Sequence, residues 1–326
     1  MARALEEAGA RWLAVADIEE GMELREAGVR ARILVFGALS VSALDGVFTH
    51  DLTPTLSSPS AARALETAAA ARGTRIRCHL KIDTGMHRLG FRHENLPWTA
   101  PALIASPHLE IEAVSTHFGT ADDPEHPLFE SQRVAFEAAS VALAGLGAAP
   151  RARHAANSAA LLRDSRTWYD FVRPGLLLYG VTPPPLHSTL ALRPVMTLTS
   201  RIVAVKGLRA GETAGYGARF EASCATTMAV VPAGYADGLD RRLEGRGSVL
   251  VRGVRAPIVG AVSMDMLTID VTGIDGVSPG DEVVFLGSQG EGALQTIDAR
   301  EMASWIGTIP YEILCRLGAR VARQYR

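Results

Sequence analysis

The first half of the chain alternates short apolar, β-branched runs with segments of helical period. Two of the helices carry start signals, because Asp17 is followed three residues later by Glu20 and Pro59 opens an Ala-rich segment. The runs that predict strands lie at residues 12–16, 33–36, 52–56, 80–82, 111–116, 154–157 and 171–179. Continuous apolar strands between helices are typical of a parallel sheet covered on both faces, which predicts an α/β fold. These seven strands are one fewer than a closed TIM-like (β/α)8 barrel needs, and they would leave two unpaired edges.

The pattern changes after the prolines at 183–185. From about Ser188 the chain is mainly strands joined by short turns. Strands are expected at residues 195–206, 226–232, 248–251, 258–271 and 282–286, with a helix at 298–306 and a last stretch around Tyr311. We therefore predict two domains, residues 1–185 with the barrel-like pattern and residues 186–326 with a mainly β fold.

Composition and charge exclude several classes of protein. With 48% hydrophobic and 21% charged residues, the chain is globular rather than disordered or collagen-like. The net charge of -2 gives no field that would recruit nucleic acid or an anionic membrane, so neither is expected as a partner. Three widely separated cysteines without metal-ligand spacing, and no apolar run of membrane-span length, predict a cytoplasmic protein in a reducing compartment.

Lysine is almost absent from the chain. Of the 33 Lys and Arg residues, only Lys81 and Lys206 are lysines. An arginine-rich genome is the simplest cause. The consequence is nevertheless chemical, because arginine stays protonated whereas lysine can supply a neutral amine. A mechanism that needs such an amine therefore has two candidates.

Polar residues gather where four successive predicted strands end. In barrel folds this edge of the sheet builds the active site. The groups are Lys81, Asp83 and Arg88 after one strand, His117 after the next, His154, Asn157 and Ser158 after a third, and Arg173 with Gly175 at the last. A single strand-end histidine is more often structural, but four such groups together predict a convergent pocket. Gly175 could also let backbone N–H groups approach a phosphate, helped by Ser158.

A metal site is the first alternative. His117, Asp122, Asp123 and His126 lie close in sequence and suggest a divalent ion, as in a metal-dependent barrel hydrolase. However, residues 122–126 have the composition of an exposed loop, and no His-x-His pair supplies a core ligand set. We therefore predict no metal. A Gly-x-x-x-x-Gly-Lys phosphate loop is also missing, because neither lysine is flanked by the required glycines.

Eight ordered motifs resemble those of alanine racemase, a pyridoxal-phosphate enzyme with a barrel domain and a C-terminal β domain. They are KIDTGMHRLGF (81–91), STHF (115–118), AANS (155–158), VRPGLLLYG (172–180), AGYGARF (214–220), GYADG (234–238), VSMDM (262–266) and PYE (310–312). The resemblance runs from Ala2 to the C-terminus. It implies racemisation of L- and D-alanine, which provides D-alanine for peptidoglycan. It also implies pyridoxal 5'-phosphate as cofactor and a homodimer whose active sites are shared between subunits.

The resemblance assigns cofactor-binding roles to five residues. Arg173 matches the arginine that faces the pyridine nitrogen of the cofactor. Because a guanidinium does not give up a proton, that nitrogen stays unprotonated and the cofactor is a weaker electron sink, which suits racemisation better than transamination. Ser158, Gly175, Leu176 and Tyr311 match the phosphate cradle.

Catalytic and substrate-binding roles fall on residues of both predicted domains. Tyr216 matches the tyrosine that exchanges the Cα proton and comes from the partner subunit. His117 would hydrogen-bond to this tyrosine and tune its acidity. Arg88 and the main-chain N–H of Met264 match groups near the substrate carboxylate, and Tyr235 lines the entry. For Tyr235, Met264 and Tyr311, the alternative to a binding role is simple packing.

The cofactor lysine of the family has no counterpart in this sequence. In the family it lies in an N-terminal strand followed by a Tyr-Gly-His-Gly turn. We therefore expect this chain to begin inside the helix after that strand and to lack the first βα unit of the barrel. Lys81 is no natural substitute, since it matches a lysine that braces Arg88 and is carbamylated in some members. Lys206 is expected on the surface of the β domain. A start assigned too late is favoured over a genuine truncation.

Two other functions stay open at this point. One is a racemase of serine or of a broader set of amino acids, which pocket residues near Met264 would decide. The other is a cofactor-binding or dimer-partner protein without catalysis, and such a protein would need no cofactor lysine.

Overall fold

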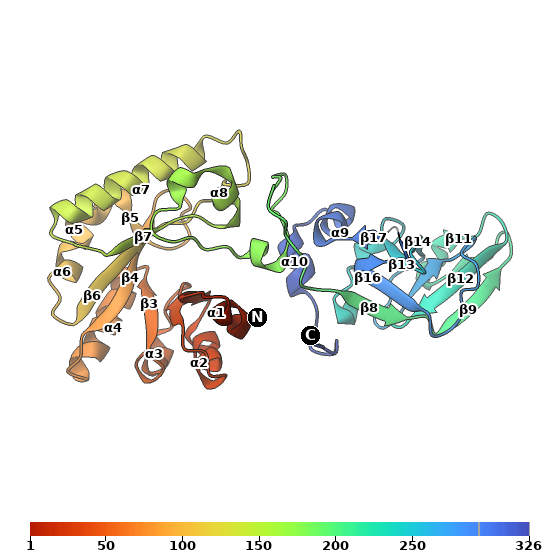
Figure 1. Cartoon of the computed structure of the whole chain (residues 1–326), viewed down its shortest axis with the longest axis horizontal. Helices are drawn as coiled ribbons and strands as arrows, with labels where there is room; N and C mark the ends of the chain where they lie inside the picture. Colours follow the sequence, from red (N-terminus) through yellow and green to blue (C-terminus); the bar gives the residue numbers. More distant parts are fainter. Residues whose placement is uncertain (293, 326) are drawn as a thin grey trace. The chain divides into compact units, whose positions relative to one another are not determined.

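The computed structural model describes residues 1–292 and 294–325, which form two compact units, Met1–Gly175 and Leu176–Arg326 (Figure 1). We call them the barrel unit and the β unit. The strands of the barrel unit run parallel, and the main sheet of the β unit is antiparallel. This confirms the predicted class, a TIM-like partial barrel followed by a mainly β domain.

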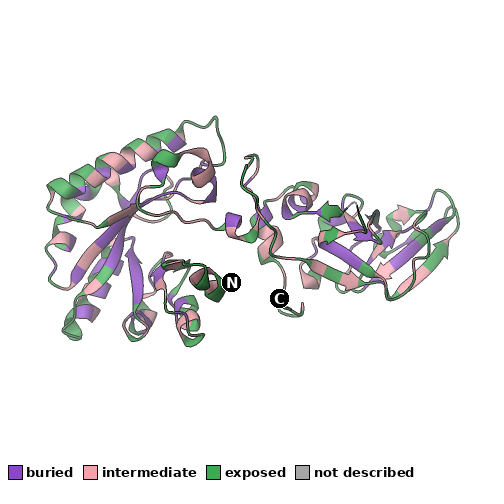
Figure 2. Ribbon diagram, in the orientation of Figure 1, coloured by how far each residue is buried: buried purple, intermediate pink, exposed green. Residues whose placement is uncertain are grey.

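The barrel unit is built on a parallel sheet with the strand order β1-β2-β3-β4-β6-β7. Its strands are β1 (Trp12–Val15), β2 (Arg32–Val35), β3 (Leu52–Leu56), β4 (Ile76–Asp83), β6 (Leu109–Ser115) and β7 (Ala152–His154), and β5 (Phe91–Arg92) pairs with β4. Its helices are α1 (Ala2–Glu7), α2 (Ile18–Glu26), α3 (Leu44–Thr49), α4 (Pro59–Ala71), α5 (Leu96–Thr99), α6 (Pro101–Ile104), α7 (Leu128–Gly145) and α8 (Ser158–Arg163). Three 3₁₀ turns, η1 (Val41–Ala43), η2 (His93–Asn95) and η3 (Ser165–Thr167), complete the unit. Figure 2 shows the central strands buried and the helices exposed on their outer side.

Helix starts in the barrel unit follow local capping chemistry. The Asp17 carboxylate accepts the N–H of Glu20 at 2.9 Å and caps α2. Glu20 in turn accepts the N–H of Ala16 at 2.7 Å, which ties α2 to the end of β1. Asn157 likewise caps α8, because its side chain accepts a main-chain N–H of the first turn at 2.9 Å. Ser158 is therefore the first residue of a helix.

Aromatic rings fill the interior of the barrel unit. Trp12 of β1 stacks on Phe171, which follows β7, with 5.9 Å between ring centroids and 9° between the planes. Phe171 also stacks on His154 at 4.3 Å, and His79 contacts both Trp12 and His154. Because β1 and β7 stand at the two ends of the strand order, these rings pack the ends of the sheet against each other.

The main sheet of the β unit has the order β17-β16-β13-β14-β15-β12-β9, and β8 pairs with β16. The strands are β8 (Leu198–Arg201), β9 (Ala204–Leu208), β12 (Thr226–Val231), β13 (Ser248–Val251), β14 (Val254–Val259), β15 (Leu267–Asp270), β16 (Glu282–Gln289) and β17 (Gln295–Ile297), with a separate pair β10 (Thr213–Ala214) and β11 (Phe220–Glu221). The helices are α9 (Ala299–Ile306) and α10 (Pro310–Cys315), and the 3₁₀ turns are η4 (Leu176–Tyr179), η5 (Tyr216–Ala218), η6 (Tyr235–Asp237) and η7 (Arg241–Leu243). Inward-facing residues such as Val249, Ile269 and Phe285 form one core.

The predicted strand at 171–179 is wrong. Residues 171–175 form a loop, and Leu176–Tyr179 form the turn η4. Pro174 has no N–H to give to a sheet, and the N–H of Arg173 is already bonded to the carbonyl of Ala156 at 2.9 Å. The predicted strand at 154–157 also stops early, at His154, because Asn157 caps α8.

The predicted strand at 258–271 is two strands, β14 and β15. The loop between them begins at Gly260, whose φ of 66° is in the left-handed region. A Cβ at this position would lie 3.0 Å from the carbonyl oxygen of Ala214, so a side chain would be strained there. Residues 195–206 are likewise two strands, β8 and β9, and the stretch around Tyr311 is the helix α10. The short strands β5, β10, β11 and β17 were not predicted.

Candidate active site

Acceptors from two segments, residues 116–117 and 154–155, hold the Arg173 guanidinium. Its Nη1 donates to Nδ1 of His154 at 2.7 Å, and its Nη2 donates to the carbonyl oxygens of Thr116 and Ala155 at 2.8 and 2.9 Å. Nη2 also lies 3.3 Å from Nδ1 of His117. Within the described residues no carboxylate pairs with this guanidinium, and its Nε–H makes no hydrogen bond. Burial lowers the pKa of Arg173 to about 9, which still leaves it charged at neutral pH. The Arg173 side chain is thus held in place by Nη1 and Nη2, and its Nε–H can donate to a further group.

Two buried histidines extend this contact into the barrel interior. Because Arg173 can only donate, Nδ1 of His154 must accept, and the ring proton of His154 is on Nε2. That Nε2–H donates to Nδ1 of His79 at 3.0 Å, which places the His79 proton on Nε2. Burial is the main cause that lowers the pKa of His79 to about 4 and that of His154 well below its usual range. Both rings are therefore neutral at physiological pH.

Lys81 lies in β4, two residues before its end, as a buried amine among positive charges. Its Nζ lies 4.4 Å from the centroid of the Phe36 ring, and the Arg173 guanidinium lies over the same ring at 4.7 Å. Burial, followed by the charges of Arg88 and Arg173, lowers the pKa of Lys81 to about 8. At pH 7 about a tenth of this amine is therefore neutral, far more than for an ordinary lysine.

The turn after β4 carries Arg88. Asp83 orders this turn, because its Oδ1 accepts the N–H groups of Gly85 at 3.1 Å and His87 at 3.0 Å. Although burial opposes it, these main-chain hydrogen bonds lower the pKa of Asp83. Gly90 closes the turn with a φ of 127°, and a Cβ there would lie 2.7 Å from the Asp83 nitrogen. Arg88 is thereby presented from a defined turn with its side chain exposed.

His117 is a neutral donor at the edge of the same group. Burial, then the charges of Arg173, Lys81 and Arg88, lowers its pKa to about 3. Its Nδ1 faces the Arg173 guanidinium, so the ring proton is on Nε2. His117 can therefore donate a hydrogen bond from Nε2 to a further group.

The metal alternative finds no support at these residues. His117 faces cationic side chains, which would repel a metal ion. Residues 122–126 form an exposed loop. Across residues 1–292 and 294–325, no three His, Cys, Asp or Glu side chains are placed to hold a metal ion.

Ser158 and Gly175 form a hydrogen-bonded pair. The Gly175 N–H donates to Oγ of Ser158 at 2.9 Å. Nothing lies within 4 Å of the position that a Cβ of Gly175 would take, so this side of the glycine is open. Leu176 is buried in the core of the β unit, so only its main chain could reach a ligand. A hydroxyl and main-chain N–H groups at the start of α8 are donors that suit an anionic phosphate.

Three of the predicted residues line one cleft of about 610 Å³ in the β unit, together with Arg241 and the loop at 261–266. Tyr216 is 77% exposed and stands in η5 between two glycines with positive φ. Tyr235 lies in η6, and Met264 is exposed on the loop between β14 and β15. A tyrosine this exposed has no packing role within the described chain, and its side chain is open to a ligand or a partner.

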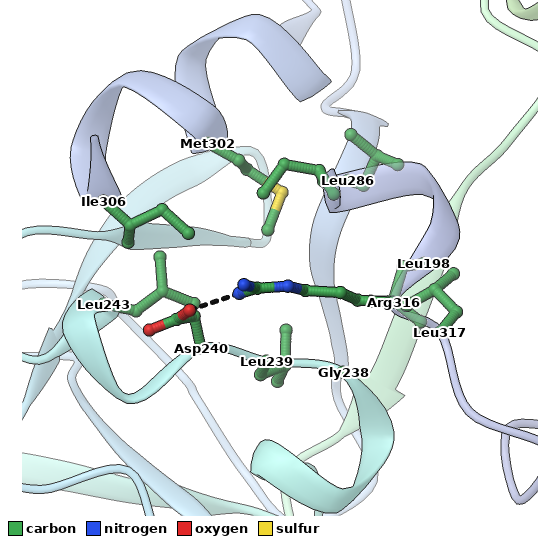
Figure 3. A pocket seen from close by; sticks show the side chains of 11 residues that line it. Leu198, Gly238, Leu239, Asp240, Leu243, Leu286, Met302, Ile306, Arg316 and Leu317 are labelled. Carbon is green, nitrogen blue, oxygen red and sulfur yellow. Dashed lines mark hydrogen bonds and ion pairs between the residues drawn. The ribbon is translucent and has the colours of Figure 1, made fainter. Parts of the chain in front are cut away.

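Tyr311 lies on α10, which ion pairs anchor to the β unit. Arg316 follows α10 and pairs with Asp240, as Figure 3 shows. Asp240 also accepts from Arg242 at 2.8 Å, and the two arginines hold its pKa well below the usual range. The apolar side chains around this pair include Leu243, Leu286, Met302 and Ile306.

The predicted site residues thus fall into separate groups. Lys81, Arg88, His117 and Arg173 are neighbours in the barrel unit, and Ser158 and Gly175 are joined by a hydrogen bond. Tyr216, Tyr235 and Met264 share the cleft of the β unit, and Tyr311 is not among the residues that line it.

Sequence reasoning missed Phe36 and His79, and it recognised His154 only as a strand-end polar residue. A signal for His79 was present, because residues two apart on a strand share a face and His79 precedes Lys81 by two. Phe36 directly follows β2, but no pattern marked it as the ring that both cations contact.

Comparison with known proteins identifies the class and then the family. The fold and site define a two-domain enzyme with a barrel-like domain and a mainly β domain. Family models described as "Alanine racemase, N-terminal domain" and "Alanine racemase, C-terminal domain" match residues 1–183 and 195–325. The chain therefore belongs to the alanine racemase family and is an isomerase.

Individual relatives agree with this assignment. An alanine racemase of Sorangium cellulosum is 42% identical over all of this chain and 87% of its own length. The alanine racemase structure from D-cycloserine-producing Streptomyces lavendulae is 37% identical, with a TM-score of 0.91, covering 98% of this chain and 84% of that one. A structure from Bartonella henselae, described with covalently bound pyridoxal phosphate, is 29% identical, with a TM-score of 0.87, covering 100% of this chain and 88% of that one. No described helix is long and apolar enough to cross a membrane.

Proposed function

We propose that this protein racemises L- and D-alanine with pyridoxal 5'-phosphate and so provides D-alanine for peptidoglycan, and that the 326 residues alone are inactive for want of the attaching amine. The observation that carries the proposal is the Arg173 guanidinium, which four acceptors orient while its Nε–H is left without a partner among the described residues. Such a donor suits a ring nitrogen that must be hydrogen-bonded without being protonated. The proposal includes a homodimer in the cytoplasm, with residues 1–185 binding the cofactor and residues 186–326 supplying the catalytic tyrosine.

The residues present fit the cofactor. The open side of Gly175 and the donors at the start of α8 suit its phosphate, for which Ser158, Gly175 and the main chain of Leu176 are proposed ligands, with Tyr311. Arg173 would face its pyridine nitrogen. When bound, pyridoxal phosphate supplies a conjugated ring that accepts electron density from the substrate Cα.

Tyr216 and His117 are proposed to handle the Cα proton. A tyrosine must be deprotonated before it can accept this proton. Neutral His117 has its ring proton on Nε2, and a hydrogen bond from it to the phenolate oxygen would stabilise the deprotonated tyrosine. Tyr216 is proposed to come from the partner subunit, consistent with its exposure on this chain.

The substrate carboxylate is assigned to Arg88 and the main-chain N–H of Met264, with Tyr235 lining the entry. We further propose that Lys81 is carbamylated. Carbamylation would convert a cation among cations into an anion that attracts Arg88, and the depressed pKa of Lys81 leaves more of the neutral amine that reacts with carbon dioxide. The mass of the intact protein, with one added carbon dioxide unit at Lys81, tests this assignment.

The amine that attaches the cofactor covalently is proposed to lie outside these 326 residues. Lys81 is buried against Phe36 beside Arg173, and Lys206 is exposed on β9 in the β unit. Because neither lysine is placed to attach the cofactor, a second candidate function is a cofactor-binding protein without catalysis.

Racemisation tests the proposal. L-alanine and, separately, L-serine are incubated with cofactor-loaded protein, and the D-enantiomer is measured by chiral chromatography. We expect the reading frame extended upstream to encode a lysine followed by a Tyr-Gly turn, and the extended protein to racemise alanine faster than serine. Equal rates would favour the broad-specificity alternative. Cofactor binding without any D-alanine from the extended protein would favour the non-catalytic one.

A further inference from the structure

Arg320 joins the two loops that carry Tyr235 and Met264. It follows α10, and its Nε lies 2.9 Å from Oδ1 of Asp237, the last residue of η6. Its Nη2 lies 2.7 Å from Oδ1 of Asp265, the residue after Met264. One guanidinium therefore bridges a carboxylate from each loop.

The main chains of the same loops touch directly. The N–H of Tyr235 donates to the carbonyl of Ser263 at 3.0 Å, and the N–H of Ala236 donates to the carbonyl of Met264 at 3.1 Å. Gly234 makes this approach possible, because a Cβ there would lie 2.3 Å from the Ser263 oxygen. Close main-chain contact brings Asp237 and Asp265 toward one guanidinium. Without the Arg320 guanidinium between them, the two carboxylates would repel each other.

We propose that Arg320 is a positioning residue that holds η6 and the Met264 loop in register, so that the Met264 N–H and the Tyr235 ring keep their places on the substrate side of the site. The proposal rests on the proposed function for the roles of Met264 and Tyr235. Arginine suits this position because two different nitrogens of a rigid fork reach two carboxylates, whereas a lysine ammonium is a single point of charge.

The test compares Arg320→Ala and Arg320→Lys with Arg323→Ala. Arg323 is a matched control, because it is an exposed arginine of the same segment whose one hydrogen bond goes to the carbonyl of Leu317. Hydrogen–deuterium exchange of the whole chain is followed by mass spectrometry in peptides that cover residues 234–238 and 263–266. We expect exchange in both peptides to speed up about tenfold in Arg320→Ala, less in Arg320→Lys, and not in Arg323→Ala.

Kinetics give a second readout, on the racemase that the proposed function describes. Loss of substrate positioning should raise the KM for alanine about fivefold and leave kcat within about twofold, with partial rescue in Arg320→Lys. A general loss of folding would instead speed up hydrogen–deuterium exchange in peptides throughout the β unit. In a background of Asp237→Asn with Asp265→Asn, removing Arg320 should change neither loop further.

Unchanged exchange in both loops of Arg320→Ala, or equal effects of the Arg320 and Arg323 variants, would overturn the proposal. So would a fall in kcat with KM unchanged. Because exchange needs no turnover, it decides the role of Arg320 in holding the loops even if the protein proves to have no racemase activity, and the two proposals can fail separately.

Discussion

Replacing Arg173 with lysine keeps a positive charge and removes the planar fork of donors. In the native side chain, Nη1 and Nη2 make hydrogen bonds of 2.7, 2.8 and 2.9 Å to His154, Thr116 and Ala155. A lysine side chain is shorter and ends in one point of charge, so we expect Arg173→Lys to keep one of these contacts.

The expected loss is large because the acceptors are buried. A hydrogen bond from a charged donor contributes about 1.5–3 kcal/mol, so losing two of them costs about 3–6 kcal/mol before any relaxation. Movement of the ammonium and of nearby acceptors offsets part of this cost. We therefore expect the free energy of unfolding of the barrel unit to fall by about 3 kcal/mol.

Urea unfolding followed by tryptophan fluorescence measures this loss. Trp12, Trp98 and Trp168 lie in the barrel unit, so three of the four tryptophans report on it. Arg166→Lys is the control, because Arg166 is an exposed arginine in surface ion pairs and its replacement should leave the free energy of unfolding nearly unchanged. Arg173→Lys should also weaken binding of pyridoxal phosphate. If Arg173→Lys unfolds within about 0.5 kcal/mol of the wild type, the guanidinium network does not hold the site as described.

Replacing His117 with phenylalanine removes the Nε2 donor, and kcat should fall by about 10² to 10³ with folding intact. Because the His117 pKa is about 3, this histidine should produce no acid limb near pH 6 in the wild-type rate profile. Arg316→Ala frees α10 from Asp240 and should lower the stability of the β unit by about 1–2 kcal/mol in the same urea assay. Hydrogen bonds from Arg32 lower the pKa of Glu112, so this pair stabilises the fold above the unfolded-state pKa of about 4.3. That stability is lost as the pH falls through the lower folded pKa, and acid titration of Glu112→Gln should lack this component.

The fold was predictable where local signals and sheet pattern agree. Asp17 caps α2 as its spacing to Glu20 predicts, and residues 52–56 form β3 within their predicted limits. The segment at 171–179 shows where such signals fail. Leu176 and Leu177 are buried as an apolar run leads one to expect, but burial does not distinguish a strand from a turn. The N–H of Arg173 is bonded to the carbonyl of Ala156, and no local pattern predicts this contact between separate segments.

The site was predictable in composition and only partly in geometry. Strand-end positions placed Lys81 and His117 together because parallel strands end at one edge, whereas Arg173 joins them from a loop that the pattern predicted as a strand. The neutral state of His117 follows first from its burial and then from three cations that converge in space, and no local pattern reveals either. The contact of Arg320 with two carboxylates likewise joins three distant segments of the chain.

The central claim is the proposed pyridoxal-phosphate site built around Arg173, in which neither Lys81 nor Lys206 is proposed to attach the cofactor. Its most direct test is titration of the 326-residue chain with the cofactor, followed by borohydride reduction and peptide mapping. The account predicts saturable binding that Arg173→Leu abolishes, with no reduced cofactor on Lys81 or Lys206. Covalent label on either lysine, or wild-type affinity in Arg173→Leu, would contradict it.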